Sequence, residues 1–164
     1  MARMTFKLGD EYGDKLLRLM NRSEETAKKA IYAGAAVMVD AVRANLRALP
    51  ETSFRYLRGA DIFDAVPRRQ KEALDKSLGI TPITQDRMGW WNAKVGFDGY
   101  GPYPSKDYPK GLPNQLVARS IESGSSFRQK IPFVAPAVRA KKKEVIAAME
   151  KAVEDEIKKT MEGA

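Results

Sequence analysis

The sequence predicts an α+β domain, in which a small, mostly antiparallel sheet packs against a long helix of the N-terminal half and an amphipathic C-terminal helix. Three observations predict this class: a helical apolar spacing before residue 50, a second one after residue 136, and short turn-bounded segments between them. The chain has 164 residues, which is the length of one domain and enough to bury roughly 70% of the unfolded surface. We therefore expect residues 1–164 to form a single domain.

Two helices are expected before residue 50. Residues 10–20 carry a short apolar stripe of helical spacing. From Ile31 to Leu49 apolar side chains recur every three or four residues, which places them on one face of a long helix that Pro50 ends. Small residues on this helix, Gly34 among them, would let another backbone approach closely. We interpret the stripe as a core-facing surface.

The middle of the chain is expected to hold short elements joined by irregular segments. Residues 51–70 show no clear periodicity, whereas residues 68–78 favour a short helix. Residues 90–97 alternate well enough to predict a strand. A second strand is predicted for residues 116–123, with a turn at Gly124 after it.

Residues 99–114 form a loop rich in proline and tyrosine. The segment holds four prolines, three glycines and three tyrosines, and it is longer than most connections inside a domain. Tyr100, Tyr103 and Tyr108 are candidates for an interface between subunits, because tyrosine offers rigid area with a polar tip. The equally open alternative is that the three rings fold back onto the domain.

Pro136 is well placed for the first turn of a C-terminal helix, because a proline there loses no hydrogen bond. Residues 132–136, Pro-Phe-Val-Ala-Pro, form a rigid lead-in to it. Glu154 with Lys158 is an ion pair of helical spacing on the polar side. Seven apolar residues mark the other side: Val138, Val145, Ile146, Met149, Val153, Ile157 and Met161.

The composition excludes most of the common kinds of catalytic site. The sequence has no cysteine and no histidine, so it offers no thiol nucleophile, no thiolate or imidazole metal ligand and no imidazole base. It also lacks a phosphate-binding loop, a dinucleotide fingerprint and a calcium loop. We therefore expect a protein that is not an enzyme, without catalytic, cofactor-binding or metal-binding residues.

The net charge of +8 raises the question of nucleic-acid binding, because clustered lysines and arginines neutralise phosphates. The positive charge is spread along the chain, and no segment forms a basic arm. Two interpretations of the basic residues stay open, a solvated surface or a surface facing DNA phosphates. The candidate DNA-facing residues are Arg68, Arg69, Lys141, Lys142 and Lys143.

The sequence shows neither a signal peptide nor a membrane span. Its first residues turn acidic and polar before any apolar stretch begins. The longest apolar run, residues 30–39, is about half of the ~20 residues that cross a bilayer. The lack of cysteine also fits assembly in a reducing cytoplasm. We expect no membrane partner.

Two short motifs near the C-terminus occur in a characteristic order. The first lies within residues 117–125, and the second, at residues 132–137, opens the last helix. In one protein family, named below, the same order is found: members show "tyrosine-alanine, two or three residues, glutamate, one residue, glycine-threonine" and then "proline-phenylalanine, two residues, proline-alanine". The matching residues are Ala118, Glu122, Gly124, Pro132, Phe133, Pro136 and Ala137.

With a long alanine-rich helix before these motifs and a charged helix after them, the chain resembles the phage tail-completion family, which is related to minor tail protein Z of phage lambda. The resemblance covers roughly residues 5–160, and Val117 and Ser125 depart from the usual tyrosine and threonine. Relative to the family, residues 51–70 and the 99–114 loop are elaborations. The matching residues are expected to act as scaffold.

The resemblance implies a structural protein of a long-tailed phage or prophage, which completes the tail at the head–tail neck. It implies a ring of identical subunits, with stopper, terminator and tail-tube proteins as partners and contact with packaged DNA. Its place would be the virion, after assembly in the host cytoplasm. A tail terminator or another neck or minor tail component is the alternative within this class, and a basic nucleic-acid-binding module is the alternative outside it.

Overall fold

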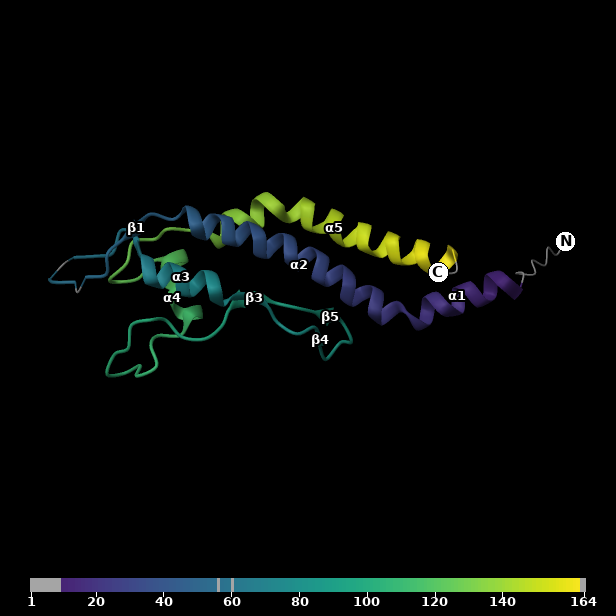
Figure 1. Ribbon diagram of the computed structural model, residues 1–164, viewed down its shortest axis with the longest axis horizontal. Coiled ribbons are helices and arrows are strands. Elements are labelled where there is room, and N and C mark those ends of the chain that lie inside the picture. Colours follow the sequence, from purple (N-terminus) through teal and green to yellow (C-terminus); the bar gives the residue numbers. More distant parts are fainter. Residues whose placement is uncertain (1–9, 56, 60, 163–164) are drawn as a thin grey trace.

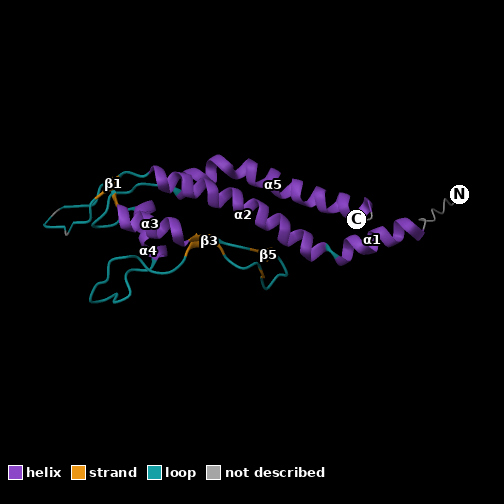
Figure 2. Cartoon of the chain, in the orientation of Figure 1, coloured by secondary structure: helices purple, strands orange, loops and turns teal. Residues whose placement is uncertain are grey.

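The computed structural model describes residues 10–55, 57–59 and 61–162, and it confirms the α+β class. Helices dominate the chain, and the strands are short (Figure 2). The helices are α1 (Asp10–Asn21), α2 (Ser23–Ala48), α3 (Arg68–Ser77), α4 (Asn114–Ser123) and α5 (Val134–Glu162). The strands are β1 (Glu51–Thr52), β2 (Val66–Pro67), β3 (Leu78–Ile80), β4 (Thr84–Gln85), β5 (Trp91–Asn92) and β6 (Val95–Phe97).

The long helices α2 and α5 lie side by side along the long axis of the molecule (Figure 1). They run antiparallel, because Lys29 near the start of α2 pairs with Glu156 near the end of α5, whereas Asn45 near the end of α2 donates to the carbonyl of Phe133. The predicted helix before Pro50 is confirmed, and α2 ends as Leu49 turns extended.

Helices α2 and α5 approach each other closely at Gly34. A Cβ atom on this residue would lie 2.6 Å from Cγ of Met149 and 3.2 Å from Cγ1 of Val145. The expected apolar side of α5 is therefore only partly covered, since Met149 and Val145 meet α2 while Ile146 and Ile157 remain exposed. Among the described residues, no helix combines the length and the apolar character that a membrane crossing requires.

The strands form three separate two-stranded pairs. β1 and β2 pair in parallel, and β3–β6 and β4–β5 pair antiparallel. The single strand predicted for residues 90–97 is thus two strands, β5 and β6, with different partners. The register shifts by one residue between the two pairs, since Ile80 pairs with Val95 but Thr84 pairs with Asn92. Pro82 lies in the segment between β3 and β4, where it has no N–H to donate to a ladder.

The strand predicted for residues 116–123 is wrong, because this segment is helix α4. Val117 and Ile121 are four residues apart and are almost completely buried, so a helix turns both into the core, while Leu116 is exposed. Pro113 precedes the helix, and Gly124 ends it with φ at +78°. Helical spacing therefore decides this segment.

The core lies where α2, α3, α4, β2 and the start of α5 meet. Phe133 is its largest buried side chain, and the ring of Phe97 packs edge-on against it with 6.0 Å between ring centres. The core thus sits at the end of the α2–α5 pair that also bears β1, α3 and α4 (Figure 1). Further fully buried side chains are Leu46, Leu74, Ile121, Val66, Val117 and Pro67.

Candidate functional site

Glu122 joins helix α4 to helix α5. Its Oε2 accepts the backbone N–H groups of Phe133 at 2.7 Å and Val134 at 2.8 Å, and its Oε1 accepts the N–H of Ala135 at 2.9 Å. The first N–H groups of a helix have no partner inside the helix, and a carboxylate there also meets the positive end of the helix dipole. We call this arrangement the Glu122 latch.

The electrostatics of the latch favour the charged carboxylate. Partial burial of Glu122 raises its pKa, but the hydrogen bonds from Val134, Phe133 and Ala135, together with the nearby charge of Lys130, outweigh this effect. The pKa of Glu122 is therefore lower than that of an ordinary glutamate. The latch is ionised at neutral pH.

The other motif residues surround the latch. Phe133, Ala118 and Ala137 are buried in the core, whereas Pro132 and Pro136 are exposed. Gly124 turns the chain with a positive φ. The structure thus brings all seven residues of the two motifs together at the α4–α5 junction. The sequence placed them in order, but it gave no sign that Glu122 binds amides eleven to thirteen residues further on.

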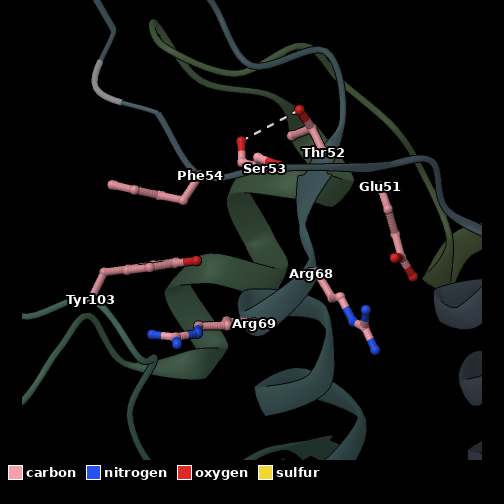
Figure 3. Close-up of a pocket in the computed structure, with 7 residues that line it drawn as sticks. All are labelled: Glu51, Thr52, Ser53, Phe54, Arg68, Arg69 and Tyr103. Carbon is pink, nitrogen blue, oxygen red and sulfur yellow. Dashed lines mark hydrogen bonds between the residues drawn. The ribbon is translucent and has the colours of Figure 1, made fainter.

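The loop after β1 and the proline-tyrosine loop meet at one end of the molecule. The ring of Phe54 stacks on the ring of Tyr103 with 4.0 Å between centres, and Figure 3 shows the two rings facing each other. A pocket of about 580 Å³ lies beside them, lined also by Arg68 and Arg69. Two segments that the resemblance marks as elaborations therefore contact each other.

The three candidate interface tyrosines differ in exposure. Tyr100 is 56% exposed and Tyr108 is 43% exposed, whereas Tyr103 is half-buried against Phe54. The base of the loop is closed by the N–H of Gly101, which donates to the carbonyl of Leu112 at 2.8 Å. Both interpretations of the tyrosines thus have a place here, since one ring folds back and two face solvent.

The five candidate DNA-facing residues lie in two places. The guanidinium groups of Arg68 and Arg69, on α3, point to opposite sides (Figure 3), and Arg68 pairs with Glu72 of the same helix at 3.0 Å. On α5, Lys142 and Lys143 are exposed, and Lys141 pairs with Glu144. Across the described part of the chain, no hydrogen bond or ion pair joins the α3 group to the α5 group.

The tip of the β4–β5 hairpin is a surface that the sequence did not indicate. Met88 is 82% exposed and Trp90 is 68% exposed. Oδ1 of Asp86 accepts the N–H groups of both residues at 2.9 Å, which fixes the turn between them. At the base of the hairpin, Nζ of Lys28 lies 4.6 Å from the centre of the Trp91 ring.

Within residues 10–55, 57–59 and 61–162, no group of three or more acidic, histidine or cysteine side chains is placed to hold a metal ion. Three features remain as candidate functional surfaces: the Glu122 latch, the stack of Phe54 on Tyr103 and the exposed tip of the β4–β5 hairpin. No protein-family model, curated protein or solved structure matches this chain.

Proposed function

We propose that this chain is a non-enzymatic structural protein that completes the tail of a long-tailed phage or prophage at the head–tail neck. In this role it acts as one subunit of a ring, with stopper, terminator and tail-tube proteins as its neighbours. Its place is the assembled virion, and its positive charge faces packaged DNA from the ring.

The Glu122 latch is the observation that carries this proposal. The residues that resemble the tail-completion family form one folded unit, in which α4, the Gly124 turn and the start of α5 are held by three hydrogen bonds to one carboxylate. This unit fixes the angle at which the long helix α5 leaves the core, which is a scaffolding task. The contiguity of the motif residues in the structure supports the proposal.

The exposed loops give the scaffold surfaces for neighbours. Tyr100 and Tyr108 are exposed on a loop whose base is closed by backbone hydrogen bonds, so the rings are presented by a structured segment. Exposed tyrosines on a fixed backbone lose little entropy on binding, which suits a contact between proteins. We assign these two rings to contacts with other neck proteins.

The first test is the mass of the purified protein by light scattering over a range of concentrations, with and without short duplex DNA at physiological salt. A closed ring, or a monomer that ignores DNA and assembles only on tails, supports the proposal. A monomer that binds DNA at micromolar or tighter affinity, with a steep loss on adding salt, replaces it with the nucleic-acid-binding module.

The second test uses phage particles produced from the genome that encodes the chain. Alanine at Tyr100, Tyr103 and Tyr108 together is expected to block the joining of tails to heads while the purified variant keeps the helical circular dichroism of the parent. Normal particle yield from the triple variant would contradict a role for this loop in the neck.

A further inference from the structure

We infer that the hairpin tip of one copy, Met88 and Trp90, inserts into an apolar pocket between α4 and α5 of the next copy. This inference rests on the proposed function, because it supplies the contact between subunits of the ring. It concerns two surfaces of this chain, a protrusion and a depression, that lie far apart on the same molecule.

The hairpin tip has the features of a binding anchor. Large apolar side chains at exposures of 82% and 68% are costly to leave in water, and here the two, Met88 and Trp90, share one short turn. The turn is rigid: Asp86 accepts both N–H groups through its side chain, its own N–H donates to the carbonyl of Trp90, and Gln85 donates to the carbonyl of Gly89 at 2.7 Å. A fixed turn reduces the entropy lost on binding.

The hairpin also stands away from the helices. It projects from the side of α2, and its tip points away from α5 (Figure 1). Its base is held on α2 by the contact between Lys28 and the ring of Trp91. The anchor is thus presented to a neighbour by a support that is part of the folded domain.

The depression lies beside the Glu122 latch. It is an open depression with a volume of about 470 Å³. Ala118 of α4 and Val134, Ala135 and Val138 of α5 give it apolar walls. Val138 is 45% exposed there, although it belongs to the apolar side of its helix.

The charges at the pocket favour an aromatic occupant. Arg119 and Arg139 line the pocket and are exposed, and neither forms an ion pair with a described carboxylate. The carboxylate of Glu122 also lines the pocket, but both of its oxygens accept backbone N–H groups at the start of α5 and pair with neither arginine. An indole ring is the side chain whose face a guanidinium binds best, so Trp90 complements this pocket better than an aliphatic or cationic group does.

The tip cannot reach the pocket of its own chain, so a contact between these two surfaces needs a second copy. The hairpin is fixed at Lys28, and the pocket begins beside Phe133, whose carbonyl binds Asn45. These two points on α2 are 17 residues apart, which corresponds to roughly 26 Å along the helix. A contact between two different surfaces of identical chains repeats head to tail, and it closes into a ring when the rotation permits.

Cysteine cross-linking tests the contact directly, because the chain has no cysteine of its own. Met88→Cys and Val138→Cys change exposed side chains, so both variants are expected to fold. Mixed and oxidised, with an affinity tag on one of them, they should give a disulfide-linked heterodimer, which requires Cα atoms within roughly 4.4–6.8 Å. Met88→Cys mixed with Lys151→Cys, an exposed position further along α5, is the matched control and should not cross-link.

Association is measured in parallel by light scattering. Trp90→Ala and Val138→Arg should each weaken self-association by about 30-fold, as expected for an aromatic anchor and for a cation placed between two arginines. Tyr32→Ala removes another exposed aromatic side chain and should leave association unchanged. Circular dichroism of each variant checks that the fold is retained.

The outcomes separate this inference from the proposed function. If the parent forms rings, but residues 88 and 138 do not cross-link and Trp90→Ala assembles normally, the hairpin contact is wrong and the ring remains. If the parent stays monomeric at every concentration and on tails, both are wrong. A specific cross-link together with weaker assembly of both variants supports the contact.

Discussion

The carboxylate of Glu122 caps helix α5, because it accepts backbone N–H groups that have no partner inside the helix. Three amides at the start of α5 donate to it, and the donor residues follow it in the chain by eleven to thirteen positions. A capping group supplied from another helix stabilises α5 and fixes its direction relative to α4 at the same time. The residue is thus important for geometry as well as for stability.

Replacing Glu122 tests the latch. Glu122→Ala removes the acceptor of three amides and is expected to lower the free energy of unfolding by about 2 kcal/mol at pH 7. Glu122→Gln keeps one acceptor oxygen and is expected to lose about half as much. Urea denaturation measures both values. Glu154→Gln, an exposed change on α5, is the control and should stay within about 0.5 kcal/mol of the parent.

The pH dependence of the same variants follows from the lowered pKa of Glu122. Its contribution is fully present above the pKa of an unfolded glutamate, about 4.3, and is lost as the pH falls through the lower folded value. The stability difference between parent and Glu122→Gln should therefore be constant from about pH 5 to 8, begin to shrink near pH 4.3, and vanish only once the pH has fallen below the lowered folded pKa of Glu122. A difference that persists unchanged at the lowest pH would show that the charge does not matter.

Gly34 sets the distance between the two long helices. Gly34→Val would place atoms where Cγ of Met149 now lies, since even a Cβ would come within 2.6 Å of it. Overpacking of this kind is expected to lower the free energy of unfolding by about 2 kcal/mol. Ala36→Val, at an exposed position of the same helix, introduces the same side chain without the clash and should cost less than about 1 kcal/mol. Equal losses in thermal or urea denaturation would refute the close approach.

At the level of elements, the loop after β1 and the proline-tyrosine loop support each other through the pair of Phe54 and Tyr103. An aromatic pair of this kind contributes about 0.5–1.5 kcal/mol beyond its buried area. Tyr103→Ala should therefore speed amide hydrogen exchange in both loops, whereas Tyr108→Ala, at an exposed ring, should leave exchange unchanged. Unaltered exchange in the loop after β1 would mean that the stack does not hold it.

The long helices α2 and α5 and the shorter helices α1 and α3 could be predicted from the sequence, whereas α4 and the short strands could not. The stripes of α2 and α5 repeat over many turns, so their spacing excludes a strand. Helix α4 has only ten residues, and its apolar positions also fit alternation, so the choice was made by the packing of Val117 and Ile121 in the core. Strands of two or three residues are shorter than any pattern that alternation can show.

The candidate sites depended even more on tertiary structure. The two motifs were found from their order, yet the role of Glu122 appears only when residues 122 and 133–135 are brought together. The Trp90 side chain belongs to a predicted strand by its sequence, and only the fold places it at an exposed tip. The tyrosines were found from composition, which cannot tell which ring packs on Phe54.

At the scale of the whole molecule, the net charge of +8 attracts DNA electrostatically, whatever its sequence. Because Arg68 and Lys141 are paired within their own helices, and the α3 and α5 groups are separate, we expect only non-specific binding by the isolated protein. Its Kd for duplex DNA should therefore be weaker than micromolar, at about 10⁻⁴–10⁻⁵ M at physiological salt. Fluorescence anisotropy over a salt series measures the Kd, and its dependence on salt should be shallow.

Alanine at Arg68, Arg69, Lys141, Lys142 and Lys143 is the companion variant for that experiment. Under the neck proposal it should weaken the non-specific binding of the isolated protein only as much as the loss of five positive charges elsewhere on the surface does. Its counterpart is a variant that removes an equal number of exposed cations elsewhere on the surface. If only the first variant loses binding, and by more than about tenfold, those five residues form a phosphate-binding surface.

The pairing of α2 with α5 has a consequence for synthesis on the ribosome. The apolar face of α2 is complete at residue 48, but the helix that covers it ends only at residue 162. At typical rates of translation, the synthesis of the residues between α2 and the end of α5 takes on the order of 10 s. During this time the apolar face of α2 is uncovered, and the nascent chain can bind chaperones or other nascent copies. Until α5 is made, Gly34 and its neighbours form a hydrophobic surface that the finished protein no longer presents.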